Sequence, residues 1–337
     1  MKPLAPVTRT LLPGAGEKAA CRGEAVSGMI NLKLHKVEQL PDTSTEAALL
    51  QDRLLEVGGS SQLVSVVMLI VADTHVHLYA CFDLRQSFAA AAVNLQSLVS
   101  ESVKKLAVPG DVPVAKFLFL TESCDCHFFR DFALDRIRIP GLRFEVTDEP
   151  QVLKVYGQQD FLFYLVAGRQ IVTRENLEIL ALGTDQDLSS GLSAKATIEL
   201  VANAGAMPVL NWAPGKWWFG RGKIVAGLIR EENQRPAFAI CDNSLRPAWT
   251  PRPRLMREAA AAGINILAGT DPLPMAGEEK ITGSYGIAVL GDIEEARPFA
   301  SMQRLLTQGE KRFFLAGRRS LLPQAVLRLS RWYLRRV

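Results

Sequence analysis

The chain has 337 residues, of which 48% are hydrophobic and 22% charged, an ordinary composition for a globular protein with a sizeable core. Its formal charge of +4 and pI near 8.8 suit an anionic substrate, but without a concentrated basic patch they are weak grounds for nucleic-acid binding. We therefore expect a small anionic substrate and do not expect nucleic acid as a partner. The longest apolar run, residues 63–72, is far shorter than the ~20 residues of a membrane helix, so no membrane partner is expected.

The first residues, 1–28, are rich in Gly, Pro, Ala and charge. They have neither a periodic apolar pattern nor the apolar stretch of a secretory signal, so we expect a flexible extension. The five cysteines are an odd number spread widely along the chain, which indicates reduced thiols and a cytoplasmic protein. Residues 29–337 are expected to form a single domain.

Predicted strands and helices alternate through this domain. Apolar residues at helical spacing predict a helix over 45–57, and the apolar run at 63–72, rich in β-branched residues, predicts a strand buried on both faces. A helix over 85–107 and a second buried strand over 114–122 follow. Residues 143–173 alternate short strand-like runs with turn signals, as an antiparallel insertion would. Further strands are predicted at 177–183, 207–213, 237–241 and 264–271, helices at 194–206, 223–229 and 254–263, and a helical segment over 298–337.

Strands that alternate with helices at this spacing predict a mostly parallel sheet, and about seven such units favour a closed barrel. The fold class we expect is α/β, a distorted TIM-like (β/α)7 barrel with an antiparallel β insertion. In such barrels the chemistry gathers at the carboxyl ends of the strands. Polar residues follow the predicted strands at these ends, namely His75 and His77, Glu122, Asn211, Asp242 and Asn243, and Asp271.

The stretch VADTHVHLY, residues 71–79, follows the first buried strand. Alternate residues of an extended strand point the same way, so His75 and His77 can share one metal ion, and Asp73 would point there too if the strand continues. Asp271 follows the last clear strand, where a carboxylate can bind a metal or accept a proton from metal-bound water. The structural alternatives are two surface histidines that fall two apart by chance, and a helix-capping or turn aspartate.

Residues 211–223, NWAPGKWWFGRGK, hold three tryptophans, three glycines and three cations in thirteen residues. Lys216 and Arg221, next to the amino end of a predicted helix, would offer a phosphate or carboxylate both charge and backbone amides. Asn211 and Trp217 are assigned to the same substrate pocket. The alternative is a loop whose tryptophans pack on the barrel while its cations face solvent.

Taken in order, these motifs from Ile70 to Ile287 resemble the PHP (polymerase and histidinol phosphatase) family, whose fold is a distorted seven-stranded β/α barrel. Residues 73–77, Asp-Thr-His-Val-His, are similar to the family's opening D-x-H-x-H. Residues 269–273, Gly-Thr-Asp-Pro-Leu, are similar to its closing Gly-Ser-Asp-x-His without the final histidine. The strand over 177–183 resembles one that normally starts with a ligand histidine, and residues 240–243 resemble a strand ending Glu-x-Asn. Other ligand positions differ, with Glu122 for Asp, Ser123 for His, Gln170 for a bridging Glu and Asn211 for His.

The resemblance implies a metal-dependent hydrolase that acts on a phosphorylated or otherwise anionic small substrate through a metal-activated water. Family members typically bind two or three ions. Because Gln170 and Asn211 are neutral and weaker ligands, we expect one divalent ion, zinc, manganese or iron. Its expected ligands are His75, His77, Asp271 and Glu122.

Asp271 or Asp242 would accept the proton, and Lys216 and Arg221 would orient the anionic substrate. The alternative function is a catalytically silent barrel that binds no metal and serves as a binding or scaffold module. Amidohydrolase barrels also open with HxH and close with Asp, but they need two further histidines after middle strands, and no histidine follows His127.

Overall fold

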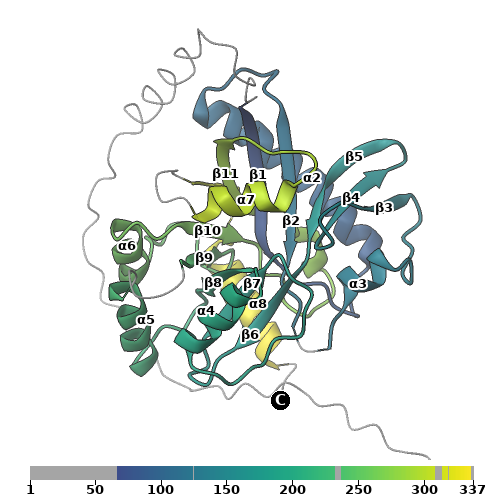
Figure 1. Ribbon diagram of the computed structural model, residues 1–337. Coiled ribbons are helices and arrows are strands. Elements are labelled where there is room, and N and C mark those ends of the chain that lie inside the picture. The colour runs from purple at the N-terminus through teal and green to yellow at the C-terminus, as the bar shows by residue number, and fades with distance from the viewer. Residues whose placement is uncertain (1–66, 124, 232–236, 308–312, 318, 335–337) are drawn as a thin grey trace, which may run out of the picture. The chain divides into compact units, whose positions relative to one another are not determined.

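The structure is a computed structural model that describes residues 67–334 except 124, 232–236, 308–312 and 318. The expected extension at 1–28, the helix at 45–57 and the beginning of the first predicted strand lie outside the described residues. The described residues form a mixed α/β fold with one seven-stranded and one five-stranded sheet (Figure 1). This confirms the α/β class.

The seven-stranded sheet is built around β1 (Met68–Val76), which is buried along nearly its whole length, as its unbroken apolar run predicts. This strand pairs in parallel with β2 (Val114–Leu120) and antiparallel with β11 (Tyr285–Gly291), a strand that the sequence did not predict. The strand order is β12-β11-β1-β2-β5-β4-β3, completed by β3 (Leu142–Val146), β4 (Val152–Gly157), β5 (Asp160–Val166) and β12 (Phe314–Gly317).

The five-stranded sheet has the order β10-β9-β8-β7-β6. The strands β8, β9 and β10 run parallel to one another, whereas β7 is antiparallel to both β6 and β8. The amino end of β7 therefore lies at the same edge of the sheet as the carboxyl ends of β8, β9 and β10. The strands are β6 (Gly168–Val172), β7 (Glu178–Leu182), β8 (Met207–Asn211), β9 (Ala239–Asn243) and β10 (Ile266–Gly269).

The predicted helices at 85–107, 194–206, 223–229 and 254–263 are confirmed as α2, α4, α5 and α6. Asp83 caps α2 by accepting from the Gln86 amide, and Ser193 caps α4 in the same way from Ala196. The predicted helical segment at 298–337 is interrupted by β12, which extends the sheet beyond β11. The helical elements are α2 (Leu84–Leu106), α3 (Phe128–Ala133), α4 (Ala194–Asn203), α5 (Gly220–Arg230), α6 (Arg254–Ala261), the 3-10 turn η2 (Glu278–Ile281), α7 (Pro298–Thr307) and α8 (Leu322–Leu334).

The two sheets approach each other where β10 faces β1 and where β6 faces the end of β2. At the first edge a Cβ on Gly269 would lie 2.4 Å from the Cβ of His75, so only glycine allows this approach. At the second edge Glu122 forms an isolated parallel bridge with Arg169. Side-chain contacts, such as Thr74 Oγ1 to the Ala268 carbonyl at 2.9 Å, stand in for ladder hydrogen bonds at the first edge. The predicted closed barrel is therefore not confirmed, because the described strands form two sheets.

Within the described residues, no helix has the length and apolar character that crossing a bilayer requires.

Candidate metal centre

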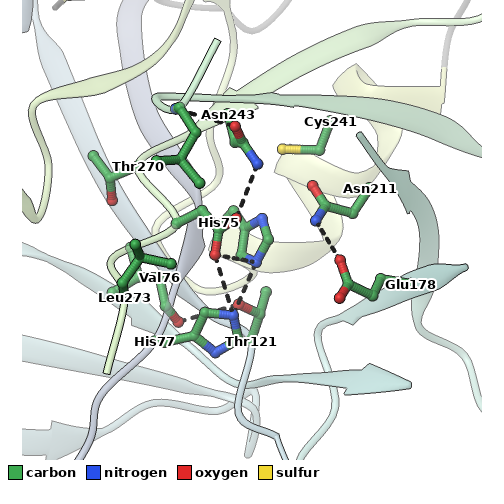
Figure 2. A network of polar contacts seen from close by, with 12 residues as sticks. His75, Val76, His77, Thr121, Glu178, Asn211, Cys241, Asn243, Thr270 and Leu273 are labelled. Carbon is green, nitrogen blue, oxygen red and sulfur yellow. Dashed lines mark hydrogen bonds and ion pairs between the residues drawn. The ribbon is translucent and has the colours of Figure 1, made fainter. Parts of the chain in front are cut away.

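Three of the four predicted metal ligands meet at one point. His75 and His77 come from the end of β1, and Asp271 comes from the loop that follows β10. The two imidazole Nε2 atoms lie 3.0 Å apart, and both rings point into the same space (Figure 2). Asp271 Oδ1 lies 3.5 Å from Nε2 of His75 and 3.6 Å from Nε2 of His77.

The spacing of these three atoms matches a small metal ion. Sides of 3.0, 3.5 and 3.6 Å define a circle with a radius of about 2 Å. Zinc–nitrogen and zinc–oxygen bonds are about 2.0–2.2 Å, so an ion close to the plane of the triangle would reach all three atoms. Two imidazoles and one carboxylate also leave coordination positions for water, as in catalytic rather than structural sites.

Asp73, which was expected to point toward the histidine pair only if the strand continued, does not join the cluster. The register between β1 and β2 shifts between Asp73 and Val76, so the strict alternation of side chains is lost here. The Asp73 carboxylate instead accepts hydrogen bonds from the Thr270 amide at 3.0 Å, the Thr270 hydroxyl at 2.6 Å and the Gly283 amide at 2.9 Å. It joins β1 to the loop that carries Asp271.

The position of Asp271 is fixed by its backbone and by one amide. Its φ is 47°, a left-handed value that few residues other than glycine adopt, and its amide donates to the His75 carbonyl at 2.9 Å. Asn243 Nδ2 donates to Asp271 Oδ2 at 2.9 Å, which leaves Oδ1 facing the histidines. Asn243 is thus a positioning residue, which we did not assign to the site from the sequence although it ends a predicted strand.

Burial sets the charge of the cluster. Desolvation lowers the pKa of His75 and of His77 to about 4, so both rings are neutral at pH 7 and keep a lone pair for a metal. Desolvation also raises the pKa of Asp271 to about 6, although His77 opposes this rise. The cluster can therefore offer two neutral nitrogens and one carboxylate near neutral pH.

A second carboxylate, Glu178, acts on this cluster and was missed from the sequence. It is the first residue of β7, and because β7 runs antiparallel, this amino end lies at the edge where the site is. Burial alone would raise its pKa, but Lys216 at 2.9 Å and Asn211 at 3.0 Å lower it below the ordinary value. Its negative charge in turn raises the pKa of His75 and of Asp271. Its position in the sequence could have identified it, because it lies near the start of the strand that begins with a ligand histidine in the PHP family.

These residues fit a divalent cation in charge. Asp271 and Glu178 supply two negative charges and Lys216 one positive charge, which leaves a net charge of about −1 beside two neutral imidazoles.

The second ring nitrogens of the two histidines depart from well-ordered metal sites. The Nδ1 atoms of His75 and His77 are buried without a hydrogen-bond partner in the described part of the chain, whereas a metal-bound imidazole usually donates its other N–H.

Glu122 does not join the cluster. Its Oε1 accepts from the Phe129 amide at 3.3 Å, and its Oε2 lies 3.9 Å from Arg169 Nη1. Burial raises its pKa to about 7, against the opposing effect of these contacts. The prediction of Glu122 as a fourth ligand is corrected for this reason, since the carboxylate turns toward α3 and Arg169.

Asp242 is engaged by partners of its own. Arg246 Nε donates to both carboxylate oxygens at 2.8 and 3.0 Å, Arg246 Nη2 donates to Oδ2, and the Tyr285 hydroxyl donates to Oδ2 at 2.7 Å. All of these groups are buried. Because both of its carboxylate oxygens are engaged by these partners, we no longer assign Asp242 to catalysis.

The remaining predicted substrate residues lie next to the cluster but are already hydrogen-bonded. Trp217 is buried and its indole N–H donates to the Asn211 carbonyl at 3.0 Å, so it anchors the loop. Arg221 donates to the Gly215 carbonyl at 2.9 Å within the same loop. Lys216 pairs with Glu178 but stays about one-third exposed, which leaves donors for an incoming anion.

Neither known family models nor curated proteins match this chain. Among solved structures, it is similar to PsfC from Pseudomonas syringae PB-5123, at 15% identity and a TM-score of 0.46 over 80% of this chain and 98% of that one. It is also similar to the lesion-specific endonuclease PfuEndoQ from Pyrococcus furiosus, at 10% identity and a TM-score of 0.40. A third similar structure is an endonuclease Q complex with a 27-mer duplex that carries an abasic lesion at the active site, at 9% identity and a TM-score of 0.44.

Both endonuclease matches cover 73% of this chain, which spans 58% of their length. All three TM-scores are below 0.5, and we take no residue role or activity from these chains. One prediction needs correction nevertheless. We expected no nucleic-acid partner, and the similar endonuclease Q structure, which holds a 27-mer duplex substrate, contradicts that exclusion, which we withdraw.

Proposed function

We propose that the chain is a PHP-like, metal-dependent hydrolase of phosphate esters. The observation that carries the proposal is the meeting of His75, His77 and Asp271 around a circle of about 2 Å radius, although Asp271 lies far away in sequence. The D-x-H-x-H and Gly-Thr-Asp motifs that resemble the PHP family supply these three residues, which supports the family assignment and the related barrel-like arrangement.

His75, His77 and Asp271 would hold the ion, and zinc, manganese or iron suits this donor set. When bound, such an ion lowers the pKa of a coordinated water so that hydroxide is available near neutral pH. Asn243 keeps Asp271 Oδ1 turned to the histidines. Asp271, 14% exposed, is the most open member of the cluster and can pass a proton to solvent.

Lys216 would bind the anionic substrate. Its ammonium is held by Glu178 on one side and remains partly exposed on the other, so a phosphate oxygen can approach it. Asn211 holds Glu178 from the opposite side at 3.0 Å. Phosphate binding would in this way be coupled to the carboxylate whose charge acts on His75 and Asp271.

The second candidate is a silent module that binds no metal. The unpartnered Nδ1 atoms of both histidines favour it, because a strongly bound metal usually has oriented ligands. The neutral Gln170 and Asn211 at positions where the PHP family has ligands favour it too.

The deciding experiment measures metal content and hydrolysis together. Protein freed of metal is titrated with zinc, manganese and iron(II), and hydrolysis of p-nitrophenyl phosphate and its diester is followed. His77→Ala should lose both metal and hydrolysis. The matched control is His127→Ala, because His127 precedes α3 without a side-chain capping bond and lies outside the cluster. Absence of bound metal at saturating supply in the wild-type protein would favour the silent module.

A further inference from the structure

Two loops beside the candidate metal centre expose large aromatic side chains. The loop between β8 and α5 exposes Trp218 by 50% and Phe219 by 79%, and the loop between β9 and α6 exposes Trp249 by 65%. We call these three residues the aromatic rim. Tryptophan and phenylalanine are seldom left so open in a folded chain, and a group of them marks an interaction surface.

Asn243 connects the starts of both loops to the metal centre. Asn243 Nδ2 donates to Asp271 Oδ2 and also to the Trp212 carbonyl, at 2.9 Å each. The first loop begins at Trp212, and the second loop begins just after Asn243. The helices that end these loops, α5 and α6, lie side by side (Figure 1), and a Cβ on Gly222 would lie 3.8 Å from Leu255 Cδ1.

The backbone of each loop is held while its aromatic side chains face outward. In the first loop the buried Trp217 serves as the anchor, and Phe219 is kept at a φ of 56°, a conformation that costs free energy. In the second loop Arg246 and Arg319 donate to the Thr250 carbonyl at 2.6 and 3.3 Å. A ligand that stacks on the rim would therefore meet surfaces that are already ordered, which reduces the entropy lost on binding.

The same two segments carry positive charge and no acid. Residues 213–230 contain four Lys or Arg residues and no Asp or Glu, and so do residues 244–257. The exposed members are Lys223, Arg230, Arg254 and Arg257, of which Arg254 pairs with Glu258, just beyond the second segment, at 2.6 Å. Across the whole chain Lys and Arg outnumber Asp and Glu only by 39 to 35, so this is a local concentration of charge. It is formed by two segments and is not visible in any single run of the sequence.

We propose that the aromatic rim binds an unpaired stretch of nucleic acid, whose bases stack on Trp218, Phe219 and Trp249 while its phosphates contact the surrounding cations. This names the substrate class of the candidate metal centre and so rests on the proposed function. A mononucleotide would need one ring and one phosphate contact. Three rings on two loops with the exposed cations Lys223 and Arg257 beside them fit a ligand in which flat bases and phosphates repeat along a chain.

The test is fluorescence anisotropy of a labelled oligothymidylate of about 20 nucleotides, titrated with the full chain in EDTA. Trp249→Ala and Trp218→Ala should each weaken binding roughly 5- to 100-fold, the range expected for loss of one stacked base. The matched control is Tyr333→Ala, since Tyr333 is an equally exposed aromatic residue, 49%, on α8 outside both loops. Lys223→Ala should lower the slope of log Kd against log salt by about 0.7.

Three results would overturn the inference. These are equal affinity for a duplex of the same sequence, equal affinity for base-free polyphosphate, and binding to anionic lipid vesicles in preference to the oligonucleotide. The two proposals fail separately. If His77→Ala binds the oligonucleotide as the wild type does and the wild-type protein binds no metal, the nucleic-acid proposal is supported and the hydrolase proposal is wrong. If metal and ester hydrolysis are found without oligonucleotide binding, the rim alone is wrong.

Discussion

Two clusters of buried polar residues lie at the ends of neighbouring strands of the five-stranded sheet, and they differ in how their charges are balanced. At the end of β9, Asp242 is saturated by Arg246 and Tyr285. At the end of β10 and β1, Asp271 faces two neutral histidines, and no Lys or Arg of the described residues forms a salt bridge with its Oδ1.

The comparison shows that position at a strand end is not enough to identify a working site. A carboxylate whose charge is neutralised inside the protein has little left to offer a ligand. The negative charge of a carboxylate beside neutral nitrogens is not balanced by the protein, and a divalent ion can balance it. The Asp242 cluster therefore stabilises the fold, and the Asp271 cluster is the candidate for function.

The largest expected effect is on the Asp242 cluster. Arg246→Ala would leave a buried carboxylate without its cation and should lower the free energy of unfolding by about 3–5 kcal/mol. Urea denaturation measures this loss. Metal affinity of the folded variant should match that of the wild type. A loss below about 1 kcal/mol would show that Asp242 is not a structural residue and would contradict the proposed difference between the Asp242 and Asp271 clusters.

Bound metal should stabilise the folded chain only through the cluster of His75, His77 and Asp271. With metal at about 100 times its Kd, the free energy of unfolding should rise by about 2.7 kcal/mol, since the unfolded chain has no preformed site. Thermal melts with and without metal test this in the wild type and in His77→Ala. The variant should show no shift. An equal shift in His77→Ala would mean that the ion binds somewhere else.

Asn243→Ala should have an intermediate effect. Removal of the amide that orients Asp271 should weaken metal binding by roughly 10- to 100-fold, the usual cost of losing an outer hydrogen-bond partner. Isothermal titration with zinc measures the change. Asn243 Nδ2 also holds the Trp212 carbonyl, so Trp217→Phe, which loosens the same loop without touching Asp271, serves as the control. Equal weakening in both variants would assign the effect to the loop.

The smallest effect per step is the dependence on pH. The pKa of each histidine is about 4, so both rings are mostly unprotonated at pH 5, whereas Asp271, with a pKa of about 6, is already half protonated at pH 6. Protons then compete with the metal, and zinc affinity should fall by about tenfold per pH unit between pH 6 and 4 and more steeply below. Titrations at stepped pH test this. A midpoint near 6.5 that disappears in the histidine variants would indicate histidines with ordinary pKa values.

The contribution of Asp271 to folding stability changes with pH in the opposite direction to metal affinity, because it decreases as pH rises. The pKa of Asp271 is about 6 in the folded chain against an ordinary value of 3.8, so the folded state binds the proton more tightly. Its contribution to stability is fully present below pH 3.8 and is lost as pH rises through 6. Asp73, whose pKa burial raises to about 7, contributes with the same sign. Added metal should reverse the trend for Asp271, because the ion favours the ionised carboxylate.

Local features of this protein could be predicted from its sequence. The apolar run before Asp73 predicted the buried strand β1, residues 85–107 predicted the helix α2, and the motifs around His75 and Asp271 named the ligands that meet. These signals work because periodicity, caps and strand ends depend on residues that are close in the chain.

The hydrogen-bond partners of the buried carboxylates could not be predicted, because several of them lie far away in the sequence. Asp242 accepts a hydrogen bond from Tyr285, 43 residues away, and Asp73 accepts hydrogen bonds from Thr270 and Gly283, about 200 residues away. Glu178 reaches the site because β7 runs antiparallel. The basic and aromatic surface arises from two loops that neither run of sequence shows alone. The physical reason is that a charge is balanced by whatever lies within a few ångströms in space, and that set of neighbours is fixed by the packing of strands, which is not local in the sequence.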